Sequence, residues 1–554
     1  MTTAAADTGT EATASRFLTS SAWRVAALAL AAAVFAGVVV MTAFAAAQIA
    51  ADSDGASLVL EGHSIIHGHL LLQGWALSLD SFWTSEVPFY AAGDALAGVS
   101  PALLTFIPAV LYALVVLLGT LAAGVALRGR AAAIGMAAAF ALLAFPTWAS
   151  TLFVLRGGHH MGAVIWSLAA FLALCLRRVR LGVALAVVCL LLGMLGDLLT
   201  VAYGTLPLVC AGATRALRER RATSGILLAG AGVGSGLLYL AVHELVRHLG
   251  GFTSSAGNGI AHTPHQLLAN LRHLYSLGGE LIGLKSTVFG TNGTPGWLEA
   301  FRVIGGLVVV ACCVAAAARV LWGIASGTRR ASRAADWRGD LDSRALVMDD
   351  LLVFASLGSA GSYLLLAAFD TAAFTRYLAP AAIFMSVLTG RMLCRLYRSL
   401  QVTGLRRLLL AAGSVVSLML LAGFADRTSR GPAQQPGVDL AAWLEAHGLR
   451  HGVGDYWAAS ITTVVSHGRV QVRPVVPNPA GRLVRYDRES DASWYRDQGF
   501  EFLVFQEGAA STGIDARLAV RTWGRPAHSY VVGSYHVLVW SHPIVVSAVG
   551  GFAS

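Results

Sequence analysis

The sequence predicts a polytopic α-helical membrane protein of about eleven transmembrane helices, with a small extracytoplasmic α/β domain at its C-terminal end. Of the 554 residues, 56% are hydrophobic and only 13% are charged, whereas a soluble domain has about 25% charged residues. The mean hydropathy is +0.65. Windows of about 20 apolar residues, the length that crosses a bilayer, recur throughout residues 23–424.

The chain begins with a small polar tail, residues 1–22, which we expect to lie in the cytoplasm. The apolar run that follows is too long for the core of a signal peptide, about 7–15 residues, so an uncleaved membrane helix is expected there. The predicted spans begin near Trp23, Ala102, Ala131, Gly162, Leu181, Thr200, Gly225, Val303, Met348, Tyr377 and Leu408.

Arginine residues indicate the orientation of the chain. Every second connection between predicted spans is Arg-rich, whereas residues 51–100 contain no Lys or Arg. Because cytoplasmic loops carry the excess of Lys and Arg, we expect the N-terminus inside and, with an odd number of spans, the C-terminal region outside. This predicts a multi-pass protein of the bacterial plasma (inner) membrane with an extracytoplasmic active site. The net charge of +10 does not indicate nucleic-acid binding, because the cations form no single basic face.

The first long outer loop, residues 51–100, contains an amphipathic pattern. Leu58, Ile65 and Leu72 recur every seven residues, with Glu61 on the opposite side. This pattern is typical of a helix that lies in the plane of the membrane interface.

The second long outer loop and the C-terminal region complete the predicted organisation. Residues 249–301 include "HTPHQLLANLRHLYSLGGEL", which predicts another such helix. The polar segment 425–437 is expected to be a linker into an α/β domain of residues 438–554. There "VDLAAWLEAHGL" predicts a helix, and "RVQVRPVV", "EFLVFQE" and "YHVLVWS" predict strands.

Two carboxylates, Asp52 and Asp54, follow the first span directly at the outer surface. Asp54 stands next to Gly55 and suits the N-cap of a helix, which leaves Asp52 as the better general base. Both carboxylates are also candidate ligands of a divalent metal. Considered alone, the pair is explained equally well as a structural helix cap.

Cations at other outer turns predict an anion site. Arg156, Lys285 and Arg376, the last followed by Tyr377, could together hold a phosphate or pyrophosphate. Arginine binds phosphate through two parallel hydrogen bonds, and lysine acts as a point charge. The other polar residues expected at the outer face of the site are His159, His160, Asp197, Glu280 and Asp370.

Other sequence motifs give little support for a cofactor. His63, His67 and His69 have a spacing that zinc could use, but no HExxH motif or cysteine set accompanies them. The chain has no P-loop, Rossmann glycine pattern or GxSxG motif, so a soluble nucleotide-using catalytic domain is not expected. A divalent metal is the one cofactor that the sequence leaves open.

The layout as a whole resembles the GT-C superfamily of integral-membrane glycosyltransferases, which take sugar from a polyprenyl-phosphate carrier. The shared features are the cytoplasmic N-terminus, the long first outer loop that opens with acidic residues, its interfacial helix, the many further spans and the terminal outer domain. "TRYLAP" at residues 375–380 is similar to the Arg-Tyr turn common in bacterial members. The resemblance covers residues 20–425 and implies that Asp52 or Asp54 is the general base or helps to bind metal.

The chain also departs from the superfamily pattern. It has Asp-Ser-Asp where the protein O-mannosyltransferase and aminoarabinose transferase types have Asp-Glu. The stretch "GHLLLQGWALSLDSFWTSEVPFYAAG" is more similar to a group of bacterial membrane proteins outside those types.

The resemblance implies an inverting transfer of a hexosyl or pentosyl unit from a polyprenyl-phosphate-linked donor to a glycan, lipid or protein acceptor of the cell envelope. Two alternatives remain open. One is a non-catalytic envelope assembly or scaffold protein. The other is a transporter or flippase, which would predict internal repeats and charges near the middle of the bilayer, whereas the polar residues here gather at the outer ends of the spans.

Overall fold

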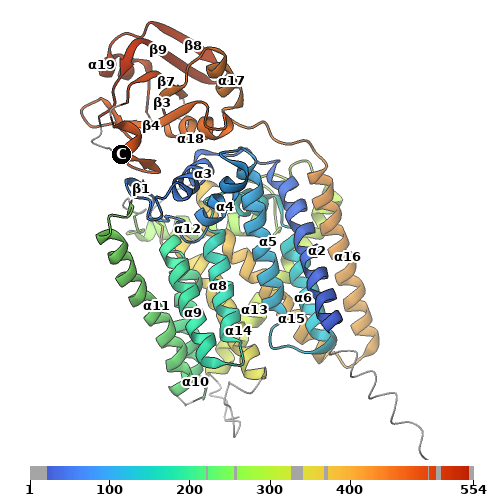
Figure 1. Ribbon diagram of the computed structural model, residues 1–554. Helices are drawn as coiled ribbons and strands as arrows, with labels where there is room; N and C mark the ends of the chain where they lie inside the picture. Colours follow the sequence, from blue (N-terminus) through green and yellow to red (C-terminus); the bar gives the residue numbers. More distant parts are fainter. Residues whose placement is uncertain are drawn as a thin grey trace, which may run out of the picture.

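The computed structural model describes residues 21–219, 222–254, 259–325, 341–366, 372–496, 498–506 and 513–547. It consists of a bundle of long helices with a smaller sheet domain on top of one end (Figure 1). Short helices and strands of the two long loops lie between these two parts, so three layers follow one another along the direction of the long helices.

The bundle makes the chain a multi-pass membrane protein. Among the described residues, eight helices are long and apolar enough to cross a membrane, and nine if one bent pair counts as a single span. The eight lie in α2 (Ser21–Ala46), α5 (Leu103–Gly124), α9 (Val179–Gly196), α11 (Ala222–His248), α13 (Gly296–Ala325), α14 (Leu341–Leu364), α15 (Ala379–Ser399) and α16 (Thr403–Thr428). The number of eleven spans stays a prediction.

The remaining predicted spans coincide with shorter helices. The bent pair is α6 (Gly129–Ala144) and α7 (Trp148–Val154), which meet at 81°. Pro146 lies in the break, where it cannot continue the helix. The other two are α8 (Met161–Leu174) and α10 (Leu206–Glu219), and α10 directly continues a π-helical turn, Val201–Thr205.

A buried arginine binds the ends of three long helices together, at the end of the bundle opposite to the sheet domain. Arg391 of α15 has an exposed fraction of 0% and pairs with Asp349 of α14 at 2.5 Å. Its guanidinium also donates to the carbonyls of Ala122 and Val125 at the C-terminal end of α5, each at 2.9 Å. The charge is therefore compensated by a carboxylate and by carbonyl groups that the helix end leaves without partners.

The layer between bundle and sheet domain comes from the two long loops and from the connection between α14 and α15. Its elements are α3 (Ser53–Ile66), β1 (Trp75–Leu77), α4 (Val87–Ala97), β2 (Thr253–Ser254), α12 (Pro264–Leu281) and the 3₁₀ turn η2 (Ala372–Tyr377). The helix predicted in the second loop is confirmed as α12. It begins with a capping box between Thr263 and Gln266 and exposes Leu267, Leu271 and Tyr275, as expected of a helix that contacts lipid.

The helix predicted in the first loop is present as α3, but its surroundings differ from those expected. Glu61, on the predicted polar face, is fully buried, and so is Leu58 on the apolar face. The reason is that α18 (Tyr456–Val465) of the sheet domain lies directly above α3 (Figure 1). Ser57 and Ser460 are hydrogen-bonded across this contact at 3.2 Å.

The C-terminal region contains the predicted helix and strands within a mixed sheet. Six strands follow one another in the order β5-β4-β3-β7-β9-β8. The central β3 is parallel to β4 and β7, and the other pairs are antiparallel. The elements are α17 (Val438–Ala446), β3 (His451–Gly454), β4 (Gln471–Pro477), β5 (Leu483–Arg485), β6 (Ser490–Asp491), η3 (Ala492–Tyr495), β7 (Phe500–Gln506), α19 (Ala516–Trp523), β8 (His528–Val532) and β9 (Tyr535–Ile544).

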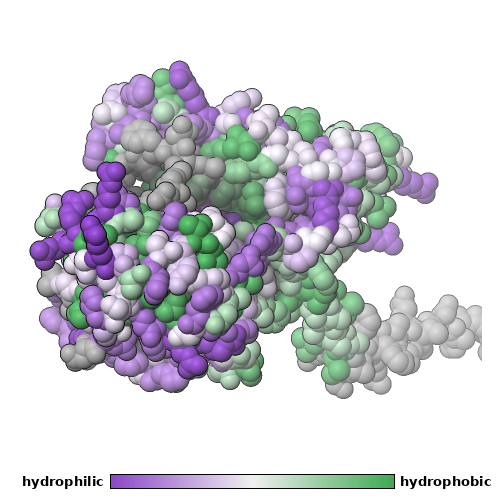
Figure 2. All heavy atoms as spheres, turned by 90° about the horizontal axis from the view of Figure 1, so that it is seen from above, coloured by the Kyte–Doolittle hydropathy of each residue, from purple (hydrophilic) through white to green (hydrophobic). Residues whose placement is uncertain are grey.

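Alternation along the strands gives this domain a core on each face of the sheet. In β7, Leu503 and Phe505 pack on the side of α19, whereas Phe502 and Val504 pack on the side of α17 and α18. Seen from above, hydrophilic residues are frequent on the outer surface of this domain, and hydrophobic residues show along the helices beyond it (Figure 2).

A second, three-stranded sheet connects the domain to the bundle. Its order is β2-β1-β6, with β1 parallel to β2 and antiparallel to β6. Both long loops and the C-terminal domain thus contribute one strand each. This ladder and the α3–α18 contact hold the domain against one end of the bundle, where the candidate site lies.

Candidate active site

Acidic and basic side chains from five separate segments surround a small cavity beneath the sheet domain. The segments are the start of α3, the loop after β1, the turn before α8, η2 and the loop before β6. The cavity has a volume of about 30 Å³ and is lined by Asp54, Leu58, Ser78, Asp80, Phe82, Gly158, His160, Arg376, Arg488 and Glu489. This volume holds a few water molecules or an ion.

The first turn of α3 assigns different roles to the two carboxylates that open the loop. Asp52 is the N-cap, and its side chain accepts a hydrogen bond from the amide of Gly55 at 3.0 Å. Asp54 lies in the first turn and lines the cavity. The expectation that Asp54 is the helix cap is therefore wrong, and the choice of the base between the two carboxylates stays a prediction. An N-cap residue has an extended backbone, and its side chain accepts from a backbone amide of the first helical turn. Asp52 meets both conditions, with the Gly55 amide as the donor.

Asp54 connects the bundle, the loop helix and the C-terminal domain. Its Oδ1 accepts a hydrogen bond from the hydroxyl of Tyr456 at 2.6 Å, and its Oδ2 lies 3.3 Å from the guanidinium of Arg376. The same guanidinium lies over the ring of Tyr377, 5.3 Å from its centroid. The structure thus brings Asp54 together with Arg376 and Tyr377, two of the residues predicted to hold a phosphate, and their role in binding it stays a prediction.

Asp52 is paired separately, at the edge of the cluster. Its Oδ2 lies 3.3 Å from Arg156, which also donates to the carbonyl of Ala50 at 3.1 Å. Burial and the charge of Asp54 raise the pKa of Asp52 to about 6, although Arg156 and the Gly55 amide act in the opposite direction. Arg156 is therefore engaged with the loop that precedes α3.

Two residues of the cavity lining, Asp80 and His160, form a candidate metal-binding group with the neighbouring Asp197. Asp80, His160 and Asp197 each offer one ligand atom, and these atoms lie within 4.8 Å of one another. His160 Nδ1 is 2.9 Å from Asp197 Oδ2, and His160 Nε2 is buried without a hydrogen-bond partner. Burial raises the pKa of both Asp80 and Asp197 to about 7, and for Asp80 the neighbouring charge of Asp197 adds to this.

The turn that carries His160 is held in an unusual backbone conformation. His160 has a φ of 68°, in the left-handed region. The carboxylate of Glu86 accepts from the amides of Gly158, at 3.0 Å, and Gly162, at 3.4 Å. Gly157 lies so close to α3 and Tyr90 that a Cβ there would meet the Tyr90 hydroxyl at 2.4 Å. These contacts explain the glycines of "RGGHHMG" and fix the position of the His160 ring.

The C-terminal domain contributes residues that the sequence did not predict. Arg488 and Glu489 line the cavity, and Glu489 accepts from the amide of Ser78 at 2.9 Å. With Tyr456 they place three side chains of the sheet domain at a site built on α3. Asp80 and Glu86 were also not predicted. Both lie in the loop of residues 51–100, which contains several Asp and Glu but no Lys or Arg, and this composition could have indicated further acids at the site.

Three predicted residues have structural contacts outside the cavity. Lys285 donates to Ser276 Oγ at 2.9 Å and lies over the ring of Tyr275. Glu280 accepts from the amides of Thr287, Val288 and Phe289, at 2.5–2.9 Å, and so organises a loop. His159 is buried, with Nδ1 3.1 Å from the carbonyl of Phe153. Asp370 lies outside the described residues.

The three histidines of the first loop do not form a metal centre in this structure. Within the described ranges, Asp80, His160 and Asp197 are the only group of three or more such side chains with ligand atoms within 4.8 Å of one another. His63 instead pairs with Asp94 at 2.9 Å.

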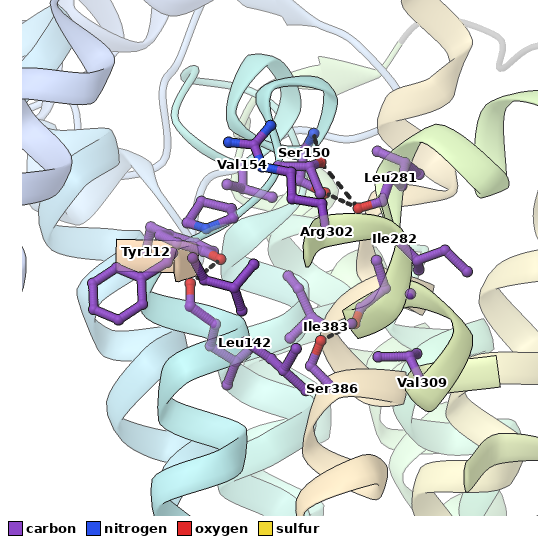
Figure 3. Close-up of a pocket in the computed structure, with 18 residues that line it drawn as sticks. Tyr112, Leu142, Ser150, Val154, Leu281, Ile282, Arg302, Val309, Ile383 and Ser386 are labelled. Carbon is purple, nitrogen blue, oxygen red and sulfur yellow. Dashed lines mark hydrogen bonds between the residues drawn. The ribbon is translucent and has the colours of Figure 1, made fainter. Parts of the chain in front are cut away.

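A different cavity lies deeper in the bundle (Figure 3). It has a volume of about 50 Å³, and its lining from α5, α6, α7, α12, α13 and α15 is mostly apolar. The one charged residue in the lining, Arg302, pairs with Glu299 at 2.7 Å. Ser150 donates to the carbonyl of Leu281 across this cavity at 2.8 Å. Because its polar groups are mutually satisfied, this cavity is a packing feature between helices.

Comparisons with known proteins give matches in fold only. No family model and no curated protein matches the chain. The oligosaccharyltransferase of Archaeoglobus fulgidus, in complex with Zn and sulfate, is 12% identical over 85% of this chain and 68% of its own, with a TM-score of 0.45. ArnT from Cupriavidus metallidurans, bound to undecaprenyl phosphate, is 14% identical over 96% of this chain and 100% of its own, with a TM-score of 0.47. The apo state of the same ArnT is 12% identical over 93% of this chain and 98% of its own, with a TM-score of 0.48. The chain is similar to these two proteins in the arrangement of its fold alone, at 12–14% identity.

Proposed function

We propose that the protein is a membrane glycosyltransferase that transfers a sugar from a polyprenyl-phosphate carrier to an acceptor of the cell envelope, with Asp54 as general base. The observation that carries this proposal is the position of the Asp54 carboxylate, between Tyr456 and Arg376 and in one cavity with Arg488. A carboxylate beside two guanidinium groups at a membrane surface suits a reaction in which a hydroxyl loses a proton while a phosphate leaves.

The reaction would be a single displacement. The acceptor hydroxyl gives its proton to Asp54, its oxygen bonds to the anomeric carbon, and the bond from that carbon to the phosphate oxygen breaks with inversion. The polyprenyl phosphate leaves as an anion, which Arg376 and Arg488 stabilise. Each carboxylate oxygen has two lone pairs, so Asp54 retains acceptor capacity beside its bonds to Tyr456 and Arg376.

The cations proposed to bind the carrier phosphate differ in part from those that the sequence suggested. Arg376 remains in the set, and Arg488 joins it because both line the cavity of Asp54. Arg156 and Lys285 are engaged with Asp52 and Ser276 instead, and we assign them to positioning the surrounding loops.

An apolar cavity offers a place for the prenyl chain. It has a volume of about 270 Å³ and lies between α12, α13, α14 and α15. Its lining includes Leu378, which directly follows the Arg376–Tyr377 turn. A carrier with its phosphate at Arg376 could therefore place its first isoprene units against Leu274, Leu281 and Leu378.

The group of Asp80, His160 and Asp197 fits a divalent cation. Two carboxylates and an imidazole are ligands that such cations accept, and the buried Nε2 of His160 has no hydrogen-bond partner. A cation bound there would neutralise the two acids and attract the phosphate of the donor. The residues themselves hold the floor of the cavity in place, since Asp197 also accepts from the amide of Leu199 at 2.9 Å.

The site is proposed to face the outside of the plasma membrane, because the Arg-rich connections lie at the other end of the spans. Arg391 and Arg395 with their partner Asp349 belong to that other end.

A transfer assay tests the proposal. The purified protein, in lipid nanodiscs, is incubated with polyprenyl-phosphate-linked radioactive sugars and a cell-envelope extract. Asp54→Asn is expected to lower the rate about 10²–10⁴-fold, the usual contribution of a general base, whereas Asp52→Asn retains most of the activity. Asp439→Asn, at an exposed helix start of the sheet domain, is the matched control. Full activity of Asp54→Asn would exclude this mechanism, and absence of transfer by the wild-type protein with every donor would favour the scaffold alternative.

A further inference from the structure

A second polar cavity lies between the end of α3 and the C-terminal domain, and the proposed reaction does not use it. Its volume is about 480 Å³, within the range of about 300–1,000 Å³ of small-molecule sites. The side chains that matter here are His63, His67, Gln471, Arg473, Asp491 and Trp494. Leu60, Trp75 and Val99 add apolar surface.

This cavity adjoins the carboxylate site along two shared elements. Asp54 at the start of α3 lines the first cavity and His63 near its end lines the second, a distance of about 14 Å along a helix. On the β6 side, Glu489 lines the first cavity and Asp491 the second. A chain-like ligand could therefore occupy both cavities at once.

Arg473 presents an unpaired guanidinium to this cavity. The group lies 4.1 Å from the centroid of the Trp494 ring, and one terminal nitrogen donates to Gln471 Oε1 at 3.0 Å. Its Nε has no hydrogen-bond partner, and within the described ranges Arg473 forms no ion pair. The guanidinium is thus held in place on one side and available to a ligand on the other.

Two imidazole rings on α3 are oriented in the same way. His63 Nδ1 contacts the carboxylate of Asp94 at 2.9 Å, and His67 Nδ1 contacts the carbonyl of His63 at 2.7 Å. Both partners accept hydrogen bonds, so Nδ1 donates in each ring and Nε2 is the nitrogen left for a ligand. The two rings lie 4.2 Å apart at the same wall of the cavity.

We propose that this cavity binds a saccharide unit of the acceptor, so that the acceptor is a glycan or a glycosylated lipid. A sugar ring combines hydroxyl groups, each a donor and an acceptor, with apolar C–H surfaces. The cavity offers donors on Arg473, acceptors on Asp491 and the histidines, and apolar surface on Trp494 and Leu60. A simple anion fits less well, because the carboxylate of Asp491 lines the same cavity as Arg473 and offsets its charge. The role of this saccharide as the acceptor rests on the proposed function, whereas the binding of a saccharide in this cavity does not.

Saturation-transfer NMR on the full-length protein in nanodiscs tests the binding. The probes are three disaccharides, cellobiose, chitobiose and α-mannobiose, added without any donor. At least one is expected to receive saturation from the wild-type protein. Arg473→Gln and the exposed His67→Leu are each expected to weaken its binding about tenfold or more, as loss of a hydrogen bond with a charged or oriented group predicts.

Matched variants separate this inference from the proposed function. Arg469→Gln removes a nearby exposed arginine that pairs with Glu445 outside the cavity, and Asp54→Asn removes the base. Both are expected to bind the disaccharide as the wild-type protein does. Saturation of none of the three probes, or equal binding by the Arg473 and His67 variants, would overturn the inference. Disaccharide binding by a protein that transfers no sugar would leave the cavity assigned and refute the reaction instead.

Discussion

At the scale of single residues, buried acids decide the properties of the site more than the exposed ones do. Glu61 of α3 is fully buried under the sheet domain. Burial and the neighbouring charge of Glu489 raise the pKa of Glu61 well above its ordinary value, and burial also raises the pKa of Glu489. The neutral form of Glu61 is thus the one that the closed structure accommodates.

This pair predicts a stability that falls with rising pH. A carboxyl whose pKa is raised on folding binds more protons in the folded state than in the unfolded state. Its favourable contribution to the free energy of unfolding is therefore complete below the unfolded pKa of about 4.3 and is lost as the pH rises through the folded pKa. Glu61→Gln keeps the shape without the charge, and we expect a higher melting temperature than that of the wild-type protein at pH 8 and a smaller difference at pH 5. Thermal unfolding in detergent between pH 5 and pH 8 measures this. Glu445→Gln, in an exposed pair with Arg469, should leave the pH profile unchanged.

The group of Asp80, His160 and Asp197 predicts stabilisation by a divalent cation. A ligand that binds only the folded state at about 100 times its dissociation constant adds about 2.7 kcal/mol. We therefore expect Zn²⁺ or Mn²⁺ to raise the melting temperature of metal-stripped protein, and Asp197→Asn to remove that rise. Asp426→Asn, which changes an exposed pair with Arg430, is the control. An equal rise in both variants would assign the cation to another site.

At the scale of elements, single side chains bind helices from distant parts of the sequence. Arg391 of α15 connects to α14 through Asp349 and to the end of α5 through its carbonyls. The ends of these helices would otherwise leave carbonyl groups without partners. This contact lies far from the cavity and should affect stability without a specific effect on transfer.

Removal of one partner of this pair is expected to destabilise the bundle. Asp349→Ala leaves the Arg391 charge buried and uncompensated, for which the usual cost is about 3–5 kcal/mol. The double variant with Arg391→Met should recover part of that loss, because the fully buried charge is then removed and Arg395, the other partner of Asp349, is partly exposed. Denaturant unfolding in detergent micelles provides the measurement. Arg398→Ala, near the exposed end of α15, should change stability by less than about 0.5 kcal/mol.

Tyr456 shows how an element of the sheet domain can act on the base. Its hydroxyl donates to Asp54 at 2.6 Å, and a hydrogen bond to a charged group is worth about 1.5–3 kcal/mol. Tyr456→Phe should therefore lower transfer about tenfold or more while the rest of the fold stays intact. The diagnostic readout is the pH profile of transfer, which should shift because Asp54 loses a donor. A lower rate with an unshifted profile would leave Tyr456 only a packing role.

The sequence could predict the secondary-structure elements further than it could predict the contacts of single residues in the site. The 3.6-residue and alternating patterns predicted the long helices, α12 and the strands β4, β7 and β9, because each depends on local apolar spacing. The sequence placed Asp54 and Arg376 on the same side of the membrane, but it did not predict the contact between them. The cap role of Asp52 and the burial of Glu61 did not follow, because they depend on which segment covers α3. Arg488 and Tyr456 lie more than 400 residues from Asp54 in the chain, and no local pattern indicates such a contact.

At the scale of the whole molecule, the sheet domain covers the carboxylate site. The cavity of about 30 Å³ is too small for a sugar phosphate, so the proposed reaction predicts a movement that separates α18 from α3. The hydrogen bond between Ser57 and Ser460 marks where these two helices meet.

A reversible cross-link tests that movement. Ser57→Cys combined with Ser460→Cys places two thiols where the hydroxyl oxygens are 3.2 Å apart, close enough for a disulfide with little rearrangement. The oxidised double variant is expected to lose sugar transfer, and reduction with dithiothreitol to restore it. The two single-cysteine variants should be insensitive to oxidant. Unchanged transfer by the fully cross-linked protein would show that substrates enter without this separation.

The three-stranded sheet also determines when the protein can be completed during its synthesis. Ala76 of β1 pairs with Ser490 of β6, which leaves the ribosome more than four hundred residues later, roughly 20–80 s at about 5–20 residues per second. During that interval β1 has an open edge, and α3 lacks the domain that covers it. The first long loop is therefore among the last segments to reach its final structure, and a chain that ends before residue 456 leaves Asp54 without both Tyr456 and Arg488.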